Sequence, residues 1–135
     1  MIRFALVSGA LLAVTAAAAH AAGDQASAKT TNSGVYTAAQ AERGKKTFSE
    51  KCTTCHEPSR FSGDAFYESW NGKPLKDLWD VASGTMPEDN PASLKQGEYA
   101  DIIAYFLHLN EFAPGDAELQ PGAAAMAAIK VEKKK

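Results

Sequence analysis

Apolar residues in the central part of the chain recur at helical spacing. The first predicted helix starts at the capping-box pattern Thr37-Ala-Ala-Gln40, in which the threonine hydroxyl and the glutamine amide each bind a free backbone N–H, and it extends to about Cys52. Ala41, Phe48 and Cys52 form its apolar face. Gly44 interrupts this helix at a cost of about 1 kcal/mol relative to alanine, so we expect it where another backbone approaches closely.

Two further helices are predicted downstream. Pro74 suits the first turn of one helix, which Ser83-Gly84 ends. The strongest amphipathic pattern follows a second capping box, Ser93-Leu-Lys-Gln96, and ends at Asn110. Residues 58–72 are predicted to be irregular with a short helical turn near residues 66–70, and residues 85–91 to be a loop. No strand pattern is convincing, so the sequence predicts an all-α fold.

The N-terminal segment has the composition of a signal peptide. Arg3 is followed by an apolar or small-residue run from Phe4 to Ala18 and by the cleavage pattern Ala19-His20-Ala21. We expect residues 1–21 to be removed, and therefore a periplasmic protein. The alternative is a retained membrane anchor, but the run is short and rich in alanine, whereas a membrane span needs about 20 strongly apolar residues.

The remaining chain divides into three parts by composition. Residues 22–34 are polar and small and are expected to form a flexible leader, and residues 35–115 contain the helical pattern of one domain. Residues 116–135 are rich in alanine and lysine, without aromatic residues, and are expected to be a disordered tail.

The charge balance excludes one class of partner. Without the signal segment, 13 basic and 16 acidic residues remain, a formal net charge of −3. Nucleic-acid binding favours clustered lysine and arginine on one face, so we expect no nucleic-acid partner.

The sequence Cys52-Thr-Thr-Cys55-His56 carries the candidate chemistry. Two cysteines at this spacing followed by histidine are the attachment pattern for haem c, in which both thiols add across the porphyrin vinyl groups and the histidine coordinates iron. We therefore expect one covalently bound haem c.

Three other interpretations of the cysteine pair are weaker. A structural zinc site needs four ligands, but these are the only cysteines of the chain, and beyond His56 the only histidines are His20 and His108. A thioredoxin-like pair needs a βαβ setting, which the helical pattern does not provide. A disulfide between residues so close in sequence would close only a tiny loop and add little stability.

An electron carrier needs a second axial ligand. Met86 lies 30 residues after His56 in a loop flanked by prolines and is the candidate. Met126 falls in the predicted tail, and His108 falls on the last predicted helix, where a surface or interhelical position is more common. Histidine with methionine fills both axial positions and raises the reduction potential, which argues against oxygen chemistry.

The sequence resembles the class I c-type cytochrome family. The run from Gly44 to His56 is similar to that family's first helix and haem motif, Ile102-Ile103-Ala104-Tyr105 is similar to the facing side of its last helix, and Gly84-Thr85-Met86-Pro87 to its axial-methionine loop. The resemblance covers residues 35–115. It implies the class I cytochrome c fold, in which N- and C-terminal helices cross and short helices and loops surround one haem. The family's proline that accepts a hydrogen bond from the axial histidine has no clear counterpart after His56.

The resemblance also implies further site residues. Trp70, and more weakly Arg60, are candidates to bind a haem propionate; the plainer interpretation of Trp70 is a core aromatic residue. The segment from Trp70 to Leu75, followed by Leu78-Trp79, is similar to cytochrome partners or subunits of periplasmic dehydrogenases, particularly quinoprotein ones.

We therefore expect an electron carrier rather than an enzyme. It would accept single electrons from a periplasmic dehydrogenase and pass them to an oxidase or another cytochrome. Two alternatives stay open: a dedicated cytochrome subunit of a dehydrogenase complex, and a five-coordinate haem sensor or enzyme.

Overall fold

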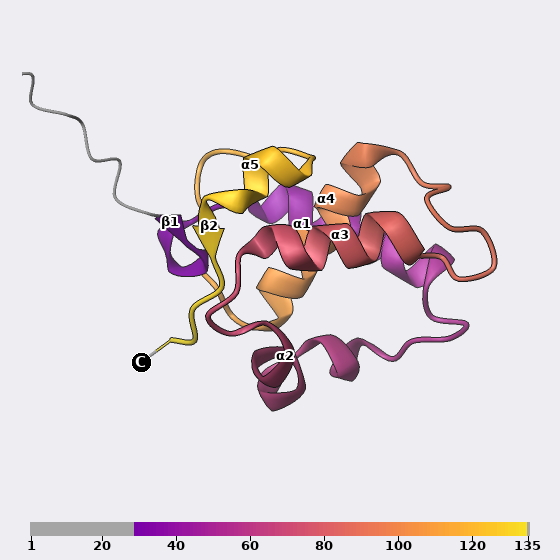
Figure 1. The fold of residues 1–135 in the computed structure, drawn as a ribbon, viewed down its shortest axis with the longest axis horizontal. Helices are drawn as coiled ribbons and strands as arrows, with labels where there is room; N and C mark the ends of the chain where they lie inside the picture. Colours follow the sequence, from indigo (N-terminus) through magenta and orange to yellow (C-terminus); the bar gives the residue numbers. More distant parts are fainter. Residues whose placement is uncertain (1–28, 135) are drawn as a thin grey trace, which may run out of the picture.

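A computed structural model describes residues 29–134 of the chain (Figure 1). Its elements are β1 (Lys29–Thr30), the 3-10 helix η1 (Thr31–Ser33), α1 (Ala38–Lys51), the 3-10 helix η2 (Pro58–Phe61), α2 (Gly63–Trp70), α3 (Leu75–Thr85), α4 (Gln96–Leu109), α5 (Ala123–Ala127) and β2 (Ile129–Lys130). The predicted signal peptide, residues 1–21, lies outside the described residues, as do residues 22–28 of the predicted leader. Within residues 29–134, no helix has the length and apolar character needed to cross a membrane. The fold is mainly helical, as predicted, with two strands of two residues each in this part of the chain.

The crossing of α1 and α4 forms the centre of the fold. Gly44 of α1 lies against the backbone of α4, because a Cβ atom built on Gly44 would be 1.8 Å from the carbonyl oxygen of Asp101. Phe48 on α1 and Ile103 on α4 are buried at this crossing. The expected close approach at Gly44 and the crossing of the first and last helices of the domain are confirmed.

The two predicted capping boxes are each only partly correct. The Thr37 hydroxyl does accept a hydrogen bond from the backbone N–H of Gln40 (3.1 Å), but the Gln40 side chain binds the backbone of Leu119 instead of Thr37. The box at Ser93 does not form, since α4 begins at Gln96, after the cap residue Lys95. The residue before Lys95, Leu94, donates its backbone N–H to the hydroxyl of Tyr99 (3.3 Å) and so belongs to a loop.

Residues 116–134, called here the C-terminal extension, are folded onto the domain. Leu119, Met126, Ile129 and Val131 are buried, α5 packs against α3, and β2 pairs in parallel with β1 (Figure 1). The expectation of a disordered tail over residues 116–135 is therefore wrong for this part. Residues 29–34 of the expected flexible leader are also ordered, through this pairing and through hydrogen bonds of Thr31 and Asn32 to Glu132. The reason is non-local: the few apolar residues of the extension match a surface that α3 and its preceding loop present.

Candidate functional site

A cavity of about 480 Å³ lies between the end of α1, α3, the loop after α3 and α4. Most of the side chains that line it are apolar or aromatic. They are Phe48, Lys51, Cys52, Thr54, Cys55, His56, Phe61, Trp70, Leu78, Val81, Ala82, Met86, Pro87, Glu88, Asp89, Leu94, Tyr99, Ile102 and Phe106. A volume in this range with few polar groups is typical of a cofactor site.

The end of α1 brings the two cysteines and the histidine to one wall of this cavity. Cys52 caps α1 by donating its N–H to the carbonyl of Phe48 (2.8 Å), and its own carbonyl accepts from Cys55 (3.1 Å) and His56 (2.9 Å). This tight turn is the structural reason for the short spacing of the motif. Both thiols are free; Cys55 is exposed, whereas Cys52 is half-buried and burial raises the pKa of its thiol.

His56 is held by aromatic packing. Phe61 meets the imidazole ring edge-on with centroids 5.5 Å apart, and Phe61 is itself stacked on Phe106 at 4.2 Å. The imidazole Nδ1 is buried and has no hydrogen-bond partner among residues 29–134. A buried polar atom without a partner costs free energy, and it is characteristic of a site that receives a further group.

The wall formed by α3 carries Met86. This residue caps the helix, and its backbone carbonyl accepts hydrogen bonds from the Tyr99 hydroxyl (2.6 Å) and from the Ala92 N–H (3.2 Å). The same hydroxyl accepts the N–H of Leu94 (3.3 Å). The Met86 loop, residues 86–94, is therefore fixed at both ends by Tyr99 of α4.

Of the other candidate residues, Trp70, Arg60, Met126 and His108, only Trp70 lines the cavity. Trp70 ends α2, is half-buried and lines the cavity, with the ammonium of Lys73 5.6 Å from its ring centre. Arg60 is exposed on η2 and does not line the cavity, so the geometry gives no support to its assignment. Met126 is buried in α5, outside the cavity lining, and His108 is exposed on α4.

Tyr99 is the main site residue that sequence reasoning missed. It is 1% exposed, lines the cavity, and packs edge-on against Trp79 with ring centroids 6.3 Å apart. Because Tyr99 lies three residues before Ile102, helical spacing in the sequence could have placed it on the apolar face of α4. Its hydrogen bonds to the Met86 loop depend on tertiary contacts and had no local signal.

These residues fit a covalently attached haem. The fit rests on two thiols in a tight turn, an imidazole with a buried unpartnered nitrogen, a methionine thioether and a mainly apolar lining in one cavity. Thioether attachment and histidine–methionine coordination of iron need this set of side chains.

The comparisons with known proteins agree with this interpretation. A family model described as cytochrome c oxidase, cbb3-type, subunit III matches residues 39–106. Searches of curated proteins and of solved structures found no match. The matched segment extends from α1 almost to the end of α4 and includes every residue that lines the cavity. Because this match covers half of the chain, the protein belongs to this family of c-type cytochromes, whose haem-binding domains carry electrons.

Proposed function

We propose that the protein is a periplasmic single-electron carrier with one haem c attached through Cys52 and Cys55. In this proposal His56 and Met86 are the axial ligands, and Trp70 borders the cofactor. A periplasmic dehydrogenase is the electron donor, and an oxidase or another cytochrome is the acceptor.

The observation that carries the proposal is the composition of one cavity. It joins the Cys52, Cys55 and His56 side chains at the end of α1 with Met86 at the end of α3. Among residues 29–134, Met86 is the only methionine that lines it. The bound haem supplies an iron that cycles between ferrous and ferric states.

The protein's own residues set the conditions for this chemistry. The His56 imidazole and the Met86 thioether would hold the iron, and this pair of ligands would raise its reduction potential. Phe61, Leu78 and Phe106 make the lining apolar, which excludes water. Cys55 and Val81 line the cavity and are exposed, Val81 by 46%, so they mark its mouth. An electron enters and leaves most readily on this side.

The surroundings of the mouth favour brief contacts with partner proteins. Lys51, Glu88 and Asp89 are exposed residues of the cavity lining, and Val81 adds a single exposed apolar side chain. A charged rim around a small apolar centre is typical of weak redox encounters. Domains of this family are typically extracytoplasmic, and cleavage after Ala21 completes the proposed route to the periplasm.

Optical spectra of the purified protein and of two methionine variants test the axial ligands. The oxidised protein should show the weak far-red band of thioether-to-iron charge transfer, and the reduced protein sharp α and β bands with no response to carbon monoxide. Met86→Ala should lose the far-red band, whereas Met126→Ala, which removes a buried methionine outside the cavity, should keep it. A wild-type protein that binds carbon monoxide at once would refute Met86 ligation and favour the five-coordinate sensor or enzyme.

Mass spectrometry and purification test the remaining parts. The intact mass should equal the chain from residue 22 plus one haem, and the haem should stay bound in acidified organic solvent. Release of the haem under these conditions would contradict covalent attachment. Isolation from cell extracts as a free monomer supports a shuttle, whereas a constant ratio to a dehydrogenase would replace it by the dedicated subunit.

A further inference from the structure

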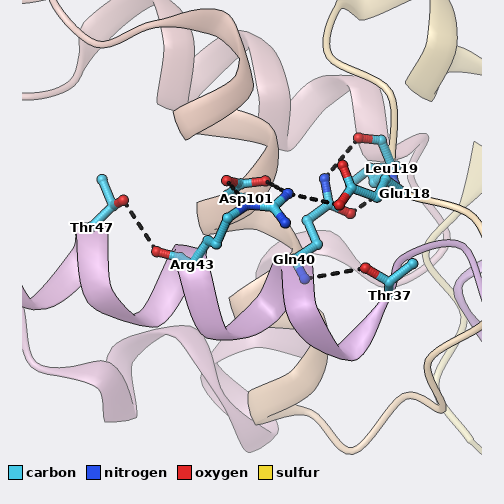
Figure 2. A network of polar contacts seen from close by, with 7 residues as sticks. All are labelled: Thr37, Gln40, Arg43, Thr47, Asp101, Glu118 and Leu119. Atoms are coloured by element: carbon cyan, nitrogen blue, oxygen red, sulfur yellow. Dashed lines mark hydrogen bonds and ion pairs between the residues drawn. The ribbon is translucent and has the colours of Figure 1, made fainter.

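The C-terminal extension lies outside the segment that matches the family, and it is attached to the domain at both of its ends. At its start, the Gln40 side chain forms two hydrogen bonds with the backbone of Leu119, of 2.9 and 2.7 Å. Arg43 bridges Asp101 of α4 and Glu118 of the extension, at 2.9 Å to each (Figure 2). Figure 2 shows this network alongside the crossing of α1 and α4.

At its end, the extension is bonded to the loop of residues 71–74 that connects α2 to α3. The carbonyl of Val131 accepts the N–H of Gly72 (2.8 Å), and the N–H of Val131 donates to the carbonyl of Lys73 (2.9 Å). The N–H of Lys133 donates to the side-chain oxygen of Asn71 (2.9 Å). In Figure 1, β2 and the segment after it run next to the start of α3.

This loop connects two parts of the cavity wall. Trp70, which lines the cavity, immediately precedes it, and α3, which lines the cavity with Leu78, Val81 and Ala82, immediately follows it. Helix α3 then ends at the cap residue Met86. Helix α3 starts at the buried Leu75, which does not line the cavity, and α5 with its fully buried Met126 packs on this helix.

We propose that the C-terminal extension is a clamp that positions Trp70, α3 and hence Met86 against the haem cavity. The proposal rests on the proposed function, since it concerns how firmly Met86 is presented to iron. The two hydrogen bonds of Val131 transmit the position of the extension to the loop, and α5 supports α3 by packing on it. Without the clamp, the wall that carries Met86 moves more freely and an external ligand replaces the thioether more easily.

The test compares the holoprotein with a chain that ends at Ala128, which lacks β2 and all three hydrogen bonds to the loop. Imidazole is titrated into each ferric protein, and loss of the far-red band reports displacement of Met86. We expect imidazole to bind about five- to tenfold more tightly to the shortened chain, because only part of the free energy of the three lost hydrogen bonds acts on Met86. Leu119→Ala is the control: it removes buried apolar volume from the extension but leaves the bonds to the loop, so its imidazole affinity should stay within about twofold of wild type.

A second pair of variants keeps the proposal testable if the shortened chain does not fold. Val131→Pro removes the N–H that binds the Lys73 carbonyl, whereas Val131→Ala trims the side chain and keeps that N–H. The proline variant should bind imidazole more tightly than the alanine variant by about fivefold. Equal affinities in this pair, or a shortened chain that binds imidazole like wild type, would overturn the clamp.

Hydrogen exchange separates this proposal from the proposed function. Relative to wild type, the shortened chain should show a larger increase in amide exchange rate in α3 than in α1. Leu119→Ala should instead raise the exchange rates of both helices by similar factors. If the wild-type protein shows no far-red band, Met86 ligation fails, and the exchange pattern alone decides on the clamp. An equal increase in the exchange rates of α1 and α3 in the shortened chain then refutes the clamp.

Discussion

Replacing Tyr99 by phenylalanine tests how Met86, the proposed axial ligand, is held. The Tyr99 hydroxyl donates to the carbonyl of Met86 (2.6 Å) and accepts from the N–H of Leu94 (3.3 Å), so one atom closes the loop between these residues. Phenylalanine keeps the aromatic ring that packs against Trp79 and deletes only this atom. The variant therefore isolates the hydrogen bonds from the packing.

The size of the effect follows from the partners that are left behind. The Met86 carbonyl keeps its bond from the Ala92 N–H (3.2 Å), whereas the Leu94 N–H loses its side-chain acceptor. Each lost hydrogen bond costs about 1 kcal/mol net, which gives roughly 1.5–2 kcal/mol for the pair with one end still satisfied. If about 1.4 kcal/mol of this holds Met86 on the iron, an external ligand gains about tenfold in affinity.

The assay is imidazole binding to the ferric protein, followed by the far-red band, together with the free energy of unfolding. Tyr36→Phe is the matched control, because its buried hydroxyl also donates to a backbone carbonyl, that of Phe112 (2.5 Å), but Tyr36 does not line the cavity. Both variants should lose about 1–2 kcal/mol of stability. Only Tyr99→Phe should bind imidazole about tenfold more tightly. The role assigned to Tyr99 is refuted if both variants change imidazole affinity equally, or if Tyr99→Phe leaves it unchanged.

Three further predictions concern the helix crossing, the C-terminal extension and the thiols. Gly44→Ala should destabilise the protein by about 3 kcal/mol or more in chemical denaturation, because the new Cβ meets backbone at 1.8 Å, whereas Gly97→Ala, where nothing lies within 4 Å, should be neutral or stabilising. Gln40→Ala should cost roughly 2–4 kcal/mol, since it leaves a buried N–H and carbonyl of the extension without partners. In haem-free protein, iodoacetamide should alkylate Cys55 before Cys52, because Cys55 is exposed and burial raises the pKa of the Cys52 thiol, which keeps it protonated.

Each of these predictions has an outcome that contradicts it. Equal stabilities of the two glycine variants would show that α1 and α4 can separate at little cost. For Gln40, the control is Gln120→Ala, an exposed residue of the extension whose loss should cost less than about 0.5 kcal/mol. A similar loss of stability in Gln40→Ala and Gln120→Ala would contradict the energetic importance of the two buried hydrogen bonds between Gln40 and Leu119. Alkylation of Cys52 first, judged by peptide mass spectrometry, would contradict the burial argument.

Local spacing along the chain was sufficient to predict the haem motif and the main helices. The turn from Cys52 to His56 places three side chains on one wall because neighbouring residues in a tight turn can do little else. Helical periodicity predicted α1, α3 and α4, and a glycine inside an otherwise regular helix, Gly44, indicated the close crossing. The family model matches this same segment, residues 39–106.

The way in which these parts are supported depends instead on tertiary contacts. Gln40 was expected to cap its own helix, yet it binds Leu119, because the extension offers a buried N–H and carbonyl with no other partners among the described residues. The extension itself contains scattered apolar residues without a clear period, so its composition predicted disorder. Burial of Met126 and Val131 depends on surfaces that α3 and its preceding loop form only after folding. Contacts between residues far apart in sequence leave no local pattern, and for this reason the support of the Met86 loop by Tyr99 and the docking of the extension became visible only in three dimensions.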